Sequence, residues 1–79
     1  MYSESQTSPT PTPRDGRSVN QILAVVSGVD FSPGRAVQNL IANANADPNI
    51  STGNYVINLR VDDDLHGQWI AFGLAAVVS

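Results

Sequence analysis

Three consecutive carboxylates, Asp62 to Asp64, and the single histidine of the chain, His66, come nearest to a chemical site. Carboxylate oxygens are the ligands that Ca²⁺ and Mg²⁺ prefer, which makes Asp62, Asp64 and His66 weak candidates for metal ligands. Successive side chains of extended backbone point to opposite faces, however, so they converge only in a special loop. The alternating ligands and distant Glu of a calcium loop are missing. Because Asp, His and Gly are common in turns, the sequence predicts a solvated turn and no metal site.

No residue pattern indicates catalysis. An Asp–His66 pair would need a serine or threonine nucleophile, and no sequence context activates one. The stretch Gly34-Arg35 lacks the spacing of a phosphate-binding loop, and a helix cap followed by an exposed Arg is the simpler interpretation. A domain of this size is also too small to enclose a water-excluding pocket of its own. We therefore expect a protein that is not an enzyme and that has no cofactor.

Composition excludes several classes of partner. The formal charge is −3 and the four basic residues are all dispersed Arg, at positions 14, 17, 35 and 60, so no basic patch for nucleic acid exists. No segment reaches the roughly 20 apolar residues of a membrane span. The N-terminus has no apolar core of a signal peptide, which predicts a cytoplasmic protein or a component of a soluble assembly such as a virion. The absence of Cys excludes disulfides and thiolate metal sites.

The clearest pattern is a long β-hairpin at residues 54–78 around the acidic turn. Large apolar side chains alternate with polar ones before the turn, and a second alternating run follows it. A register that places Val61 opposite Gln68 and Tyr55 opposite Leu74 gathers every large apolar side chain on one face. That face carries Tyr55, Ile57, Leu59, Val61, Ile70, Phe72 and Leu74.

The opposite face of this hairpin is flatter, because it is built mostly from small residues. Arg60 would lie opposite Trp69 there, as a cation–π pair or as an anchor for a partner. We predict that this face is an interface, formed by Trp69, Arg60, Asn58, Val56, Ala71, Gly73 and Ala75.

The remaining elements complete a small α+β domain. Residues 19–29 are apolar on both parities, which favours a doubly covered strand and leaves a buried helix as the alternative. Ser32 as N-cap, Pro33 at the first position and an apolar stripe predict a helix over 32–46. Residues 1–17 are Ser-, Thr- and Pro-rich and predict an extended or disordered arm, with the folded domain over 18–79.

The expected architecture is strand–helix–strand–strand, a three-stranded antiparallel sheet backed by one helix, with strand 68–78 in the centre and a flexible N-terminal arm. We expect the helix to cover the face of Ile57, Phe72 and Leu74, which leaves the Trp69 face uncovered. An uncovered apolar sheet face is typical of an interface. A chain this small without disulfides or metal also gains stability from oligomerisation.

These patterns favour a non-enzymatic, self-assembling structural or accessory subunit, of the kind found in a shell or virion. Its partner would be a second copy, with another protein as a further partner. One alternative is a small-ligand-binding homo-oligomer that uses Trp69 as a stacking platform. The element order is similar to that of the dodecins, which are small flavin-storing proteins with a Trp on the sheet, and the likeness covers element order alone. A second alternative is an interaction module that binds another protein through its Pro-rich tail.

Overall fold

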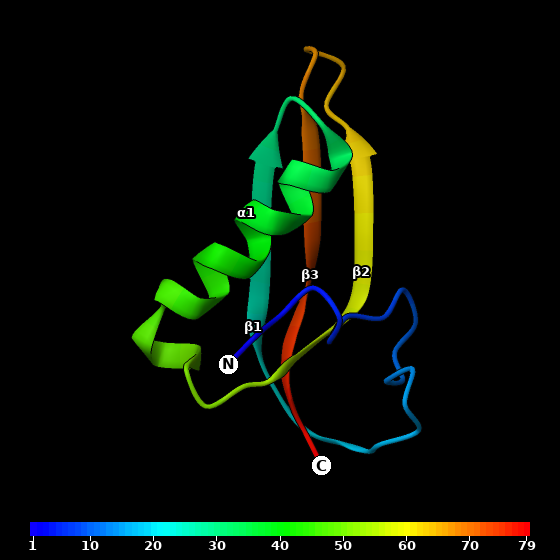
Figure 1. The fold of residues 1–79 in the computed structure, drawn as a ribbon, viewed down its shortest axis with the longest axis vertical. Helices are drawn as coiled ribbons and strands as arrows, with labels where there is room; N and C mark the ends of the chain where they lie inside the picture. The colour runs from blue at the N-terminus through cyan, green and yellow to red at the C-terminus, as the bar shows by residue number, and fades with distance from the viewer.

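A computed structural model describes residues 1–79 and shows one helix packed on a three-stranded antiparallel sheet (Figure 1). The strands are β1 (Val19–Asp30), β2 (Tyr55–Asp63) and β3 (Trp69–Val78), in the order β1-β3-β2. Helix α1 (Pro33–Ala46) and a short 3-10 turn, η1 (Pro48–Ile50), connect β1 to β2. The predicted fold class, element order and central strand are confirmed, and β1 is a strand rather than a buried helix.

Local signals fix both ends of α1. The Ser32 hydroxyl accepts the Arg35 backbone N–H at 3.3 Å, which is the N-cap contact expected from its type, and Pro33 occupies the first turn. At the other end, the Asp47 backbone N–H donates to the Ala44 carbonyl. The Asp47 carboxylate then accepts the Asn49 N–H at 2.9 Å and caps η1. The helix therefore begins and ends where the sequence predicts.

The helix covers a different face of the sheet from the one predicted. Its buried residues Ala36, Leu40, Ile41 and Ala44 pack with Val56, Ala71 and Ala75 of the sheet. The prediction that it covers Phe72 and Leu74 is therefore wrong. The physical reason is backbone approach: a Cβ atom on Gly28 of β1 would overlap the Leu40 nitrogen and the Ala36 oxygen of α1. Small residues let α1 lie closely against the sheet, and larger ones would hold it away.

The predicted hairpin register is also wrong. Tyr55 pairs with Ala76 and Ile57 with Leu74, which displaces β3 by two residues from the expected alignment. An irregularity follows at Asn58 and Leu59, where Asn58 adopts a φ of +53°. Because this bulge adds a residue, the parity of β2 changes and Arg60 pairs with Phe72. Arg60 therefore lies on the face away from α1, whereas Trp69 is half-buried against the helix-side core.

The N-terminal arm packs on its own domain, so the structure does not show the predicted flexible arm. Tyr2 lies in the helix-side core, where it is 2% exposed. The chain then runs to the outer edge of β2 and pairs with it in parallel, with Thr7 opposite Val56 (Figure 1). Four backbone hydrogen bonds join Gln6, Ser8 and Thr10 to Val56, Asn58 and Leu59, at 2.9 to 3.0 Å. The arm thus closes the first half of the β2 edge, up to Leu59.

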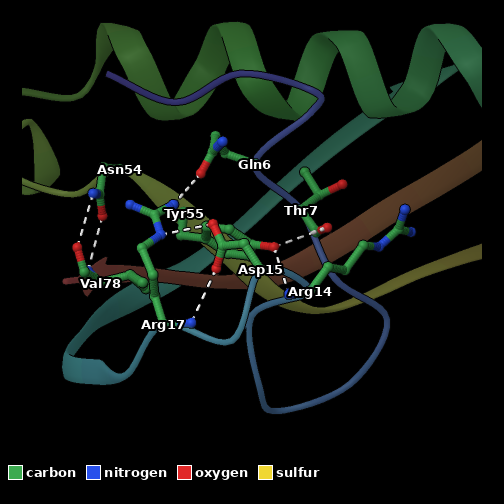
Figure 2. A network of polar contacts seen from close by, with 8 residues as sticks. All are labelled: Gln6, Thr7, Arg14, Asp15, Arg17, Asn54, Tyr55 and Val78. Atoms are coloured by element: carbon green, nitrogen blue, oxygen red, sulfur yellow. Dashed lines mark hydrogen bonds and ion pairs between the residues drawn. The ribbon is translucent and has the colours of Figure 1, made fainter.

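Beyond that edge, the arm covers Tyr55 on the face away from the helix (Figure 2). The Tyr55 hydroxyl accepts the Arg14 backbone N–H at 2.9 Å and donates to the Thr7 carbonyl at 3.4 Å. The Arg17 guanidinium lies 5.7 Å from the centroid of the Tyr55 ring and also contacts the carboxylate of Asp15. The backbone N–H of Arg17, with its guanidinium, holds the pKa of Asp15 below its usual range.

Candidate interaction surface

The sheet face away from α1 is divided into a covered half and an open half. Near the C-terminal end of β3, the buried residues Tyr55, Ile57, Ala76 and Val78 form a second core cluster beneath the arm. Near the acidic turn, the arm does not cover this face, because it lies beside the lower half of the sheet (Figure 1). We call this second region the open half-sheet, and its residues are Val25, Ser27, Val29, Arg60, Asp62, Ile70, Phe72 and Leu74.

The open half-sheet is an apolar strip with one charge of each sign along its side. Residues that are paired across strands share a face, which sets the rows Ser27–Phe72–Arg60 and Val29–Ile70–Asp62. Its most accessible apolar side chains are Val25, at 72% exposed, and Val29, at 41%. Neither Arg60 nor Asp62 forms an ion pair within the chain. A shallow hollow of about 290 Å³ lies beside Phe72 and is also lined by Asn58.

Two Asn side chains of α1 donate hydrogen bonds to backbone carbonyls on the adjacent outer edge of β1. The Asn43 Nδ2–H donates to the Ser27 carbonyl oxygen at 2.9 Å, and the Asn39 Nδ2–H donates to the Val29 carbonyl oxygen at 2.8 Å. Unpaired edge groups are the usual template for strand addition, and here two carbonyls of the edge already have donors. This part of the β1 edge therefore has fewer free acceptors for the addition of another strand.

The structure divides the residues predicted for the interface between two faces. Val56, Ala71, Gly73 and Ala75 are buried beneath α1, and Trp69 is half-buried beside them. The prediction that this face is uncovered is therefore wrong. Asn58 and Arg60 lie on the other face and line the hollow beside Phe72. Ile70, Phe72 and Leu74, which the pattern predicts on the covered face, belong to the open half-sheet instead, and Gly28 is the one sequence signal of where the helix crosses.

The acidic turn uses its carboxylates to fix the backbone. The Asp63 carboxylate accepts the Leu65 N–H at 2.8 Å. The Asp64 carboxylate accepts the backbone N–H groups of His66 at 2.8 Å and of Gln68 at 3.0 Å. Gly67 takes a φ of +85°, which a glycine adopts without strain. No group of three or more acidic or histidine side chains is placed to hold a metal ion.

The turn gives the protein an acid-sensitive contribution to stability. The His66 backbone N–H, followed by that of Gln68, holds the pKa of Asp64 below its usual value of 3.8. A lowered folded-state pKa favours folding above pH 3.8, and this contribution is lost as the pH falls through the folded-state pKa. We therefore expect Asp64→Asn to lose less stability than the wild type between about pH 6 and about pH 2, measured as urea midpoints.

The matched control for this measurement is Glu4→Gln, because the Glu4 carboxylate is exposed, accepts no hydrogen bond and lies outside the open half-sheet. It should retain the acid loss of the wild type. Equal acid losses in wild type and Asp64→Asn would contradict the role assigned to the turn.

Comparison with known proteins adds no relative to this description. The sequence matches no protein-family model and no curated protein. No helix of the structure has the length and apolar character needed to cross a membrane. A functional assignment therefore has to come from the geometry of the chain.

Proposed function

We propose that this protein is a non-enzymatic, self-assembling subunit that packs the open half-sheet against the same surface of a second copy. The observation that supports the proposal is an apolar strip on the side of the sheet that α1 does not cover, where the exposed Val25 and Val29 lie beside the half-buried Ile70, Phe72 and Leu74. Contiguous exposed apolar surface usually marks an interaction site, because leaving it in water costs free energy on the order of 25 cal/mol per Å².

The charges of the strip favour a second copy over a partner of one dominant charge. Arg60 and Asp62 lie two residues apart on the same edge strand and face, so one positive and one negative group lie along one side of the apolar strip. In a two-fold interface each residue meets its counterpart in reciprocal pairs. A two-fold axis that crosses the strands between these two residues would bring Arg60 of one copy towards Asp62 of the other, and the reverse pair would form at the same time.

The size of the surface sets the affinity to expect. The open half-sheet has eight residues, whereas a standard stable interface has roughly 20 to 30 residues on each side. This contact alone is therefore expected to give a dimer of modest, micromolar affinity. Sedimentation equilibrium over roughly 1 to 500 µM covers the range in which such a dimer would form and dissociate.

Val25→Glu is the substitution that tests the proposal most directly. Val25 is 72% exposed, so the change leaves the core of the monomer intact and puts a charge at the most accessible apolar position of the strip, on β1. Burying an unpaired carboxylate costs several kcal/mol. We expect dimer dissociation to shift by at least about tenfold in Kd, which corresponds to about 1.4 kcal/mol.

The matched control is Gln38→Glu, which adds the same charge at an exposed position of α1 on the far side of the molecule. It should retain the association of the wild type. A wild type that sediments as a monomer at every concentration would overturn the proposal, as would a Val25→Glu variant that associates as strongly as the wild type.

A further inference from the structure

The N-terminal arm lies in a site that we call the seat, which is formed by Asn45, Ile50, Gly53 and the edge of β2. At one end, the Tyr2 hydroxyl donates to the Ile50 carbonyl at 2.6 Å, and its ring lies so close to Gly53 that a Cβ atom there would overlap it. The Asn45 side chain makes two hydrogen bonds with the Tyr2 backbone. It accepts the Tyr2 N–H at 2.8 Å and donates to the Tyr2 carbonyl at 3.0 Å. The seat thus recognises an aromatic side chain followed by extended backbone.

The arm is joined to the domain in a way that suits exchange. Pro9, Pro11 and Pro13 lack backbone donors, so a released arm would stay extended and would not pair with itself. Its link to β1 is a short turn over residues 14–18 in which Gly16 takes a φ of +78°. Moving this link would break the contacts of Arg14 and Arg17 with Tyr55, and it would leave the pairing of β1 with β3 intact.

We infer that the seat also accepts the arm of a second copy, so that two chains associated through the open half-sheet exchange their N-terminal arms. Every contact in the seat would form equally well between chains, which makes exchange of an identical segment a low-cost route to assembly. The inference rests on the proposed function, because the arm covers the half of the sheet face that adjoins the open half-sheet. Association there would raise the effective concentration of one arm near the other seat.

An isotope-filtered NMR measurement on the full, unmodified chain tests the exchange. Carbon-13-labelled and unlabelled protein are mixed in equal amounts and incubated at the top of the sedimentation concentration range. We expect intermolecular NOEs between the Tyr2 ring and Gly53, two groups that are in contact in the seat. The contact between Leu40 and Gly28 serves as the internal control, because it joins α1 to β1 and should give intramolecular NOEs alone.

The outcomes separate this inference from the proposed function. A dimer in sedimentation with intermolecular Tyr2–Gly53 NOEs supports both. A dimer whose Tyr2–Gly53 NOEs remain intramolecular overturns arm exchange and leaves the open half-sheet contact standing. Intermolecular Tyr2–Gly53 NOEs that persist in Val25→Glu at wild-type intensity support exchange and overturn the open half-sheet as the contact that promotes it. A monomer without intermolecular NOEs overturns both.

Discussion

Gly28→Ala is expected to lower the free energy of unfolding by about 3 kcal/mol, the upper end of the usual cost of overpacking. The added methyl group would overlap the Leu40 nitrogen and the Ala36 oxygen of α1, which are backbone atoms and cannot rotate away. The helix would have to move off β1, and its buried contacts would weaken along its length. Domains commonly have about 0.05–0.15 kcal/mol of stability per residue, so this loss is a large share of the total. Urea unfolding followed by circular dichroism measures it.

The matched control is Gly34→Ala, in the first turn of the same helix, where nothing lies within 4 Å of an added Cβ. That change should stabilise the protein by up to about 1 kcal/mol, because alanine is the better helix former. Gly73→Ala is an intermediate case, since its Cβ would lie 2.7 Å from a Val56 methyl group, which belongs to a side chain. Equal stabilities of wild type and Gly28→Ala would show that α1 does not approach β1 so closely.

The elements of this fold are predictable from local signals, but the face that the helix covers is not. Alternation in β3 shows that Phe72 and Leu74 share one side and that Ala71, Gly73 and Ala75 share the other. It does not show which side α1 covers. Assigning the larger side chains to the helix is the natural choice when burial is judged by apolar area. The close approach of the helix backbone at Gly28 selects the smaller side chains instead.

Two further features required the structure because they depend on non-local contacts. The bulge at Asn58 changes the parity of β2, and it is held by the arm, whose Thr10 carbonyl accepts the Asn58 N–H at 3.0 Å. Nothing in the strand sequence itself predicts that contact. Tyr2, the one aromatic residue of the arm, is the only sequence signal that this segment contributes to a core, and the polar residues around it predict disorder. The open half-sheet follows from these features together, because they decide which half of the face the arm covers.

Tyr2→Ala is expected to lower the free energy of unfolding by about 3 to 5 kcal/mol, the range typical of removing a buried large aromatic ring. The ring is 2% exposed and belongs to the same core cluster as Leu40, Ile50 and Val56. Removing it leaves a cavity and releases the start of the arm, so the amide protons of Val56 and Asn58 on the β2 edge should lose protection against hydrogen exchange. Urea unfolding and native-state hydrogen exchange are the two measurements. Leu65→Ala, at an 88% exposed position, is the control and should leave both unchanged.

Tyr2→Phe separates the ring from its hydroxyl. It should cost only about 1 kcal/mol, because the Ile50 carbonyl that loses the hydroxyl still accepts the Gly53 N–H at 3.1 Å.

The hydroxyl also makes stability depend on pH. Burial, and next the charge of Asp47, raise the pKa of Tyr2 above 10.0, so the contribution of the neutral hydroxyl to stability is present below that pH and is lost as the pH rises through the folded-state pKa. The wild type should therefore lose more stability than Tyr2→Phe between about pH 8 and about pH 12. If the two lose the same amount, or if Tyr2→Ala unfolds like the wild type, then Tyr2 is not part of the core in solution, and the seat that arm exchange requires does not exist.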